Sequence, residues 1–229
     1  MPEVIEPTNV GEFIAAQRFS FEEKVDHTRI IKEFTNLYYM HKVQTWCNTK
    51  WRGVPLCKAP TDLWIYQELI EELRPDLIIE TGTLCGGSAL FLRDMLKLIF
   101  PNGQVFSIDI DHSKVFGKAK VDGITYIKGS SVDPCIVLKI EEYITAAFAQ
   151  RIMVILDSDH SKEHVLQELA LYAPLVTKGS ALIIEDTNTA GPKDAVDEWE
   201  PLHPEFQMSV MCEKFMLTFN RGGYFERVT

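Results

Sequence analysis

The sequence lacks the features that mark secreted, disulfide-stapled and membrane-spanning chains. Its five cysteines are an odd number without a CxxC pair, so neither a disulfide framework nor a cysteine–zinc site is expected. The opening residues, MPEVIEPTNVGEF, are acidic and contain no apolar run typical of a signal peptide. No stretch approaches the roughly 18 apolar residues of a membrane span. We therefore expect a cytoplasmic protein.

Basic residues are also scarce. The chain of 229 residues has 23 Lys and Arg against 33 Asp and Glu, a net charge of −10. Nucleic-acid binding depends on basic side chains that neutralise phosphates, and anionic membranes attract the same side chains. We therefore expect neither nucleic acid nor a membrane as a partner. The composition leaves open whether the excess acids are spread over the surface or gathered at a site.

The chain divides into a lead-in, residues 1–60, and a core domain, residues 61–229. Residues 1–20 have no regular pattern, and we expect them to be poorly ordered. Apolar residues at helical spacing predict a helix from Phe21 to Met40. The stretch from Thr45 to Pro60 is irregular but aromatic, so we expect it to pack on the core domain.

The core domain alternates between helices and short apolar strands. This pattern is typical of a parallel sheet with helices on both faces. The predicted strands are Leu77–Ile79, Gln104–Ile108, Ile124–Ile127, Ile152–Leu156 and Ala181–Ile184. The predicted helices are one capped by Thr61 or Asp62 and ending at Leu73, one from Gly86 to Ile99, and one from Ser161 to Tyr172. We expect Gln207–Cys212 and Lys214–Asn220 to form an antiparallel edge pair.

A glycine-rich loop, ETGTLCGGS, follows the first strand of the sheet and leads into a helix. Glycines at such a turn let a ligand approach the backbone, and the helix N-terminus offers free N–H groups. The GxGxxG pattern of dinucleotide sites is absent. Glu80 at the start of the loop favours a ligand with a positive end, such as S-adenosylmethionine. The alternative is a tight turn that binds nothing.

Polar residues follow the next two strands. Asp109 ends the second strand, where an acid accepts hydrogen bonds from a ribose diol. The small residues Gly129, Ser130 and Ser131 follow the third strand and could border an adenine. Taken singly, each of these positions is equally typical of an ordinary turn.

Carboxylates follow the fourth and fifth strands, in LDSDH and IIEDT. Neighbouring parallel strands lie about 5 Å apart, so Asp157 can meet Glu185 and Asp186. Three carboxylates at that distance repel one another unless a cation lies between them, and oxygen ligands suit Mg²⁺, Ca²⁺ or Mn²⁺. The alternative is a set of solvated loop acids. His160 and His164 could likewise be ordinary helix residues.

These motifs together resemble the cephalosporin hydroxylase/rhamnosyl O-methyltransferase family. The resemblance includes the lead-in motifs TWCNTKWRGVP and KAPTDLW and the tail from Glu213 to Tyr224, and it covers roughly residues 35–229. It implies a Rossmann-like class I methyltransferase fold, with S-adenosylmethionine and Mg²⁺ as cofactors. It also implies a small-molecule hydroxyl as the methyl acceptor, on a sugar or a natural product, and a homo-oligomer.

The resemblance assigns roles to individual residues. Asp157, Glu185 and Asp186 would bind Mg²⁺, and His160 would be the general base, with Lys162 and His164 as alternatives. The residues expected to hold the methyl donor are Glu80, Gly82, Thr83, Gly86, Ser88, Asp109, Ser131 and Asp157. A lid that excludes water would come from the Trp46–Trp64 segment or from a Thr187–Pro204 loop that contains Trp199.

Two other functions fit parts of the pattern. A nicotinamide-dependent oxidoreductase would share the alternating strands and helices, but the missing GxGxxG and the position of the acids disfavour it. A non-catalytic partner protein could keep the donor pocket. The complete set of Asp157, Glu185, Asp186 and His160 argues against a binding module, which has no need of it.

Overall fold

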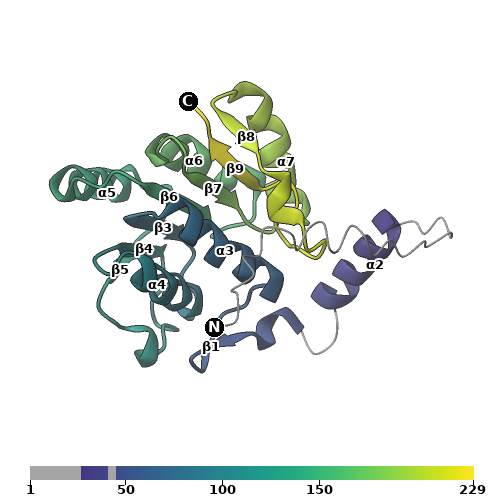
Figure 1. Cartoon of the computed structure of the whole chain (residues 1–229), viewed down its shortest axis with the longest axis horizontal. Helices are drawn as coiled ribbons and strands as arrows, with labels where there is room; N and C mark the ends of the chain where they lie inside the picture. Colours follow the sequence, from purple (N-terminus) through teal and green to yellow (C-terminus); the bar gives the residue numbers. More distant parts are fainter. Residues whose placement is uncertain (1–26, 41–44) are drawn as a thin grey trace, which may run out of the picture.

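A seven-stranded sheet forms the centre of the molecule, which we analysed as a computed structural model that describes residues 27–40 and 45–229 (Figure 1). The strand order is β5-β4-β3-β6-β7-β9-β8. The strands are β3 (Leu77–Thr81), β4 (Gln104–Asp109), β5 (Ile124–Lys128), β6 (Ile152–Leu156), β7 (Ala181–Ile184), β8 (Phe206–Met208) and β9 (Tyr224–Arg227). Strands β3 to β7 are parallel, whereas β9 is antiparallel to both of its neighbours. The predicted fold class is confirmed.

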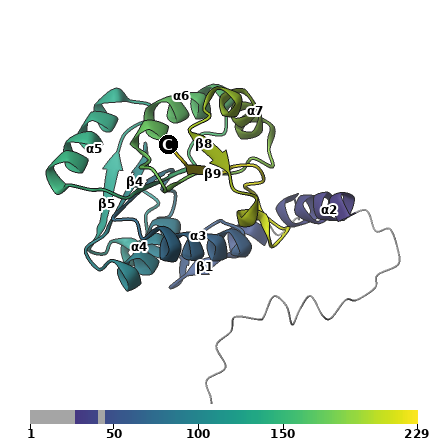
Figure 2. The same ribbon diagram turned by 45° about the horizontal axis from the view of Figure 1, so that its top comes forward.

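Helices cover both faces of the sheet (Figure 2). Helices α3 (Pro60–Leu73) and α4 (Gly87–Ile99) pack on one face, and α5 (Pro134–Ala147), α6 (Lys162–Tyr172) and α7 (Ala190–Trp199) on the other. Strand β3 shows why the central strands contain continuous apolar runs. Its Ile78 packs with α3 and α4, whereas Leu77 and Ile79 pack with the opposite layer.

Helix α5 was not predicted, although its start carries clear sequence signals. Asp133 precedes the helix and accepts a hydrogen bond from the Cys135 N–H at 2.9 Å, and Pro134 occupies the first turn. Both are typical of a helix N-terminus. The buried Ile136 and Ile140 follow at helical spacing.

The predicted start of α3 is wrong by two or three residues. The helix begins at Pro60, and Ala59 occupies the capping position without a side-chain hydrogen bond. Asp62 is buried instead, and its carboxylate accepts hydrogen bonds from the Phe219 N–H at 3.0 Å and the Tyr224 hydroxyl at 2.9 Å. The acid therefore ties α3 to the tail of the chain.

The C-terminal strand pair exists, but its second strand is not Lys214–Asn220. Strand β8 pairs with β9, and Val210–Glu213 between them is a short 3₁₀ helix, η5. Thr218, Phe219 and Asn220 are buried one after another, which differs from the alternation of a strand with one buried face. Their burial comes from contact with α3 rather than from a sheet.

Residues 45–60 of the lead-in pack beside the core domain. Helix α2 (His27–Met40) extends away from the main body in both views. The stretch 1–20 that was expected to be poorly ordered lies outside the described residues, and so does the predicted first part of the helix, residues 21–26. After α2 come η1 (Thr45–Asn48), β1 (Lys50–Trp51) and β2 (Val54–Pro55). The Trp51 indole N–H donates to Asp94 on α4 at 2.8 Å. The domain boundary at residue 60 stays a prediction.

The remaining elements are short 3₁₀ helices: η2 (Gly117–Ala119), η3 (Ala173–Leu175) and η4 (Glu200–Leu202). Within the part of the chain that the structure describes, no helix combines the length and the apolar character needed to cross a membrane. All five cysteines are free.

Candidate active site at the carboxyl edge of the sheet

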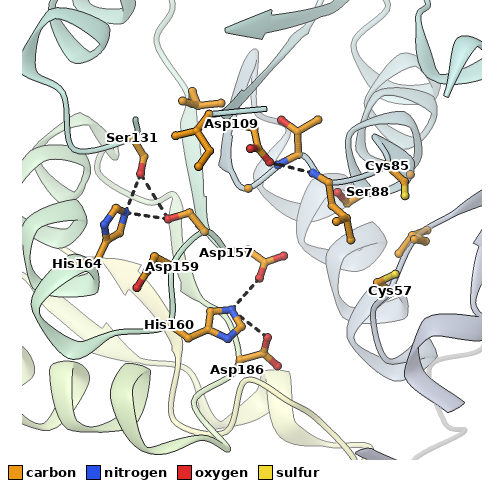
Figure 3. Close-up of a pocket in the computed structure, with 18 of the residues that line it drawn as sticks. Cys57, Cys85, Ser88, Asp109, Ser131, Asp157, Asp159, His160, His164 and Asp186 are labelled. Carbon is orange, nitrogen blue, oxygen red and sulfur yellow. Dashed lines mark hydrogen bonds and ion pairs between the residues drawn. The ribbon is translucent and has the colours of Figure 1, made fainter. Parts of the chain in front are cut away.

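A cavity of about 520 Å³ opens where the parallel strands end, a size typical of small-molecule sites (Figure 3). Strand register aligns these ends, because Thr81 pairs with both Ile108 and Leu156, and Leu156 pairs with Ile184. The residues that follow the strands therefore meet at one edge. The predicted site residues that line the cavity are Gly82, Thr83, Ser88, Asp109, Ser131, Asp157, His160 and Asp186.

An acidic centre lies at one side of this cavity. Figure 3 shows the His160 ring between Asp157 and Asp186. Its Nε2 is 3.6 Å from Asp157 Oδ1 and 3.3 Å from Asp186 Oδ2, and one ligand atom of each residue falls within 4.8 Å of the others. Two carboxylates this close, both reachable from the cavity, fit a hard divalent cation.

Glu185 lies away from this group. It is buried, and its Oε1 accepts hydrogen bonds from Lys58 Nζ at 2.5 Å and from the Tyr66 hydroxyl at 2.6 Å. Lys58 Nζ also donates to Asp157 Oδ2 at 2.7 Å. The role of Glu185 as a metal ligand stays a prediction.

The carboxylates strongly affect one another's ionisation. Burial and the charge of Asp157 raise the pKa of Glu185 to about 8 and that of Asp186 to about 6. Burial also acts to raise the pKa of Asp157, but the charges and hydrogen bonds of Lys58 and His160 outweigh it and lower that pKa. This crowding of negative charge is typical of sites that take up a cation.

His160 is the candidate base that lies at the acidic centre. Its close approach to the Asp157 carboxylate raises its pKa to about 9, with burial opposing the shift and Asp186 adding to it. With a pKa in that range His160 is mostly protonated near neutral pH, whereas an unperturbed histidine is mostly neutral there. Lys162 instead pairs with Glu198 at 2.8 Å, and His164 contacts Ser131 and Ser158.

The glycine loop is shaped by contacts within the protein. A Cβ on Gly82 would lie 1.8 Å from the Asp157 carbonyl oxygen, and a Cβ on Gly87 would lie 2.0 Å from that of Pro55. These glycines thus allow close packing of the chain, in addition to any approach of a ligand. The carboxylate of Asp109 supports the loop by accepting hydrogen bonds from the N–H groups of Thr83 at 2.8 Å and Leu84 at 3.1 Å.

Two predicted donor-binding residues do not line the cavity. Gly86 has a left-handed φ of 77° that the turn requires. Glu80 is fully buried; its Oε2 accepts a hydrogen bond from the Ser107 hydroxyl at 2.7 Å, and its Oε1 has no hydrogen-bond partner among the described residues. Burial raises the pKa of Glu80 to about 7. Their contact with a donor stays a prediction.

The far end of the cavity is polar. His164 Nε2 lies 3.0 Å from the hydroxyls of both Ser131 and Ser158, and the Ser158 hydroxyl donates to the buried Glu168 at 2.7 Å. Figure 3 shows Ser131 and His164 apart from Asp186. Ser131 follows β5 and Ser158 follows β6, and their hydroxyls lie 3.4 Å apart, so this polar group joins the loops after two strands that are not neighbours.

Aromatic side chains stand at the acidic end. Tyr39 stacks on Trp46 with ring centres 5.6 Å apart and meets the edge of Phe219 at 5.2 Å, and all three line the cavity. Sequence reasoning missed Tyr39 and Phe219 as cavity residues, because they belong to a predicted helix and a predicted edge strand rather than to the loops that follow parallel strands. Trp46 was included in the predicted lid segment, and that segment contributes Pro55, Leu56 and Cys57 to the wall as well.

The second predicted lid is wrong. Residues 190–199 form helix α7, and Trp199 is buried in the core, where it stacks on His203 and packs against Phe206 and Phe225. A side chain held in this way cannot serve as a mobile cover for the cavity. The aromatic Trp199 is a core residue.

Three residues of the cavity wall have unusual backbone angles. Cys57, Leu84 and Asp186 adopt left-handed φ values of 59°, 46° and 53°. Residues other than glycine, asparagine and aspartate rarely adopt these backbone angles. Cys57 and Leu84 therefore bring local backbone strain into the cavity wall, whereas Asp186 is of a type that tolerates this conformation.

Comparisons with known proteins agree with this geometry. The chain matches the family described as rhamnosyl O-methyltransferase/CmcI over residues 43–228. A rhamnosyl O-methyltransferase of Mycobacterium leprae (strain TN) is 36% identical over 86% of this chain and 90% of its own length. A protein of the same name from Mycobacterium tuberculosis (strain ATCC 25618 / H37Rv) is 33% identical over 76% of this chain and 75% of its own.

Solved structures show the same fold. The CmcI-N160 apo-structure has a TM-score of 0.63 and 23% identity over 80% of this chain and 77% of its own. The structure titled cmcI-D160 Mg-SAM has a TM-score of 0.62 and 23% identity over 80% of this chain and 78% of its own. The O-methyltransferase NovP has a TM-score of 0.56 and 14% identity, covering 89% of this chain and 100% of its own.

Proposed function

Because the chain belongs to the rhamnosyl O-methyltransferase/CmcI family, we propose that it transfers a methyl group from S-adenosylmethionine to a sugar hydroxyl, with Mg²⁺ bound at the acidic centre. The observation that carries the proposal is the position of Asp157 and Asp186. Their carboxylates face each other in a cavity large enough for a small-molecule donor and its acceptor. The sugar class comes from the names of the relatives, which methylate rhamnosyl groups.

The donor would occupy the middle and the polar end of the cavity. Asp109 lies at the end of β4, where an acid accepts hydrogen bonds from a ribose. Ser131 and His164 would then border the adenine, because they form the polar end of the cavity and Ser131 follows β5, the strand next to that of Asp109. This order leaves the methyl-bearing end of the donor toward Asp157 and Asp186.

The acceptor would lie between the acidic centre and the aromatic side chains. Tyr39, Trp46 and Phe219 present ring faces and edges next to Asp186, and carbon-bound hydrogens of a sugar pack on such surfaces. Asp157 and Asp186 would hold Mg²⁺, which supplies a Lewis acid that lowers the pKa of a bound hydroxyl and orients it. Alignment of that oxygen with the donor methyl supplies much of the rate enhancement.

His160 is the residue proposed to accept the proton of the acceptor hydroxyl. In this structure Asp157 and Asp186 hold a proton on its ring and raise its pKa to about 9. A general base must be unprotonated. His160 can therefore act near neutral pH only when a bound cation balances the charges of these two carboxylates and lowers the pKa of the histidine. Asp157 and Asp186 would thus both bind the cation and set the pKa of the base.

The test compares two neighbouring aspartates. Asp157→Asn is expected to abolish formation of S-adenosylhomocysteine from S-adenosylmethionine and a rhamnoside acceptor, because it removes one charge from the proposed cation site. Asp159→Asn is the matched control: it lies in the same loop, outside the group of Asp157, His160 and Asp186, and should keep most of the activity. Donor binding, measured by calorimetry, should survive in both variants.

Chelation separates the two parts of the proposal. Wild-type activity should disappear after treatment with EDTA and return when Mg²⁺ is added. Unchanged turnover in fully chelated protein would contradict the cation site. Absence of donor binding by the wild-type chain would contradict the methyltransferase activity itself.

A further inference from the structure

Lys58 is a buried positive charge behind the acidic centre. It lies in the loop between β2 and α3, its side chain is 3% exposed, and it does not line the cavity. Its ammonium donates to Asp157 Oδ2 at 2.7 Å and to Glu185 Oε1 at 2.5 Å. One lysine from the lead-in thus joins the ends of two strands of the core domain.

This contact determines how Asp157 is turned. Because Oδ2 is engaged by Lys58, the other oxygen, Oδ1, faces His160 at 3.6 Å. Asp186 Oδ2 approaches the same His160 nitrogen from the opposite side at 3.3 Å. Lys58 therefore selects the Asp157 oxygen that faces the cavity.

The lysine is held in place at both its backbone and its ammonium. The Thr49 hydroxyl donates to the Lys58 carbonyl at 3.0 Å and accepts from the Lys58 N–H at 3.3 Å. The next residue, Ala59, is fully buried. The Tyr66 hydroxyl fixes the partner acid from a second direction by donating to Glu185 at 2.6 Å. Such a charge cannot easily move away when a second cation arrives.

Building on the proposed Mg²⁺ site, we propose that Lys58 is a positioning residue: a tethered positive charge that orients Asp157 and lowers the affinity of the acidic centre for its divalent cation. A fixed ammonium a few ångströms from a divalent ion repels it, and the repulsion is strong where water is excluded. Lys58 also neutralises part of the charge of Asp157 and Glu185 when no metal is bound. The centre thereby stays folded without metal and exchanges it readily.

The test measures metal affinity rather than activity. Full-length wild type, Lys58→Gln and Lys58→Arg are titrated with Mn²⁺, and free Mn²⁺ is followed by electron paramagnetic resonance. Loss of the charge in Lys58→Gln should tighten Mn²⁺ binding by at least about tenfold, whereas Lys58→Arg should stay near wild type. Lys50→Gln, an exposed lysine on β1, is the matched control for net charge and should leave the affinity unchanged.

The outcomes separate this proposal from the one on which it rests. A purely structural role would leave Mn²⁺ affinity equal or weaker in Lys58→Gln, and that result would overturn the role of Lys58 alone. If the wild-type chain binds no Mn²⁺, the cation site falls, and the role of Lys58 with it. Lys58→Met provides a second neutral variant in case Lys58→Gln does not fold, with circular dichroism as the check.

Discussion

Glu80 is a carboxylate sealed inside the sheet, and its protonation should affect stability. Its pKa is about 7 in the folded chain, against an ordinary value of 4.5. Between these two pKa values the native state binds more protons than the unfolded state, so the contribution of Glu80 to the free energy of unfolding falls as the pH rises from about 4.5 to about 7. The loss amounts to at most about 3 kcal/mol.

Glu80→Gln removes this ionisation at nearly constant shape. The variant should be close to wild type in stability at pH 5 and more stable than wild type at pH 8, as measured by urea unfolding at both values. Glu71→Gln, an exposed acid on α3, provides the control and should show no such dependence. Equal stability of wild type and Glu80→Gln at pH 8 would mean that burial of the charged Glu80 carboxylate does not destabilise the fold.

Site residues at the ends of parallel strands were predictable from the sequence, whereas those in the lead-in were not. Asp109, Asp157 and Asp186 follow apolar strands, so their position at one sheet edge follows from the parallel topology. Lys58 and Tyr39 come from the lead-in, and nothing in their local sequence fixes where that segment docks. Lys58 lies within the KAPTDLW motif that carried the family resemblance, which was the available signal for it.

At the scale of elements, Gly191 controls how α7 meets the loop after β6. A Cβ on Gly191 would lie 1.9 Å from the carbonyl oxygen of His160. Helix propensity alone predicts that Gly191→Ala stabilises the protein by up to about 1 kcal/mol. The clash predicts the opposite: we expect a loss of about 1–3 kcal/mol as α7 or the His160 loop is displaced.

Equilibrium unfolding of Gly191→Ala shows whether the free energy of unfolding rises or falls. Gly117→Ala is the control, because a Cβ there has nothing within 4 Å. A stabilised Gly191→Ala would show that the helix and the loop adjust without cost. A destabilised variant should also have reduced turnover, because the displaced loop carries His160.

Elements were predictable where burial is continuous and unpredictable where tertiary contacts override the local pattern. Strands β3 and β6 have five residues each, all of them buried, and the apolar run in each strand identifies it directly. The stretch Lys214–Asn220 has a similar composition, but its last residues are buried against Asp62 of α3. The true last strand, β9, has only four residues, two of them buried, so its pattern is short.

At the scale of the whole molecule, donor binding should raise the melting temperature. S-adenosylhomocysteine at 100 times its dissociation constant should add about 2.7 kcal/mol to the free energy of unfolding. For a chain of this length that corresponds to a shift of roughly 5–10 °C. NAD at the same concentration should give no shift.

A thermal scan with each ligand tests this expectation. A shift with NAD and none with S-adenosylhomocysteine would favour the nicotinamide-dependent oxidoreductase instead. Added Mg²⁺ should produce a separate, smaller shift in wild type that is lost in Asp157→Asn.

The left-handed residues in the cavity wall have a consequence for engineering the protein. Cys57, Leu84 and Asp186 are three of the seven non-glycine residues with positive φ among the described residues. Leu84 is the most replaceable of them, because its backbone N–H, rather than its side chain, makes the bond to Asp109. Exchange for asparagine, which tolerates this conformation, would recover up to about 1 kcal/mol. A more heat-resistant enzyme can therefore be sought at the rim of the cavity itself, with the carboxylates left unchanged.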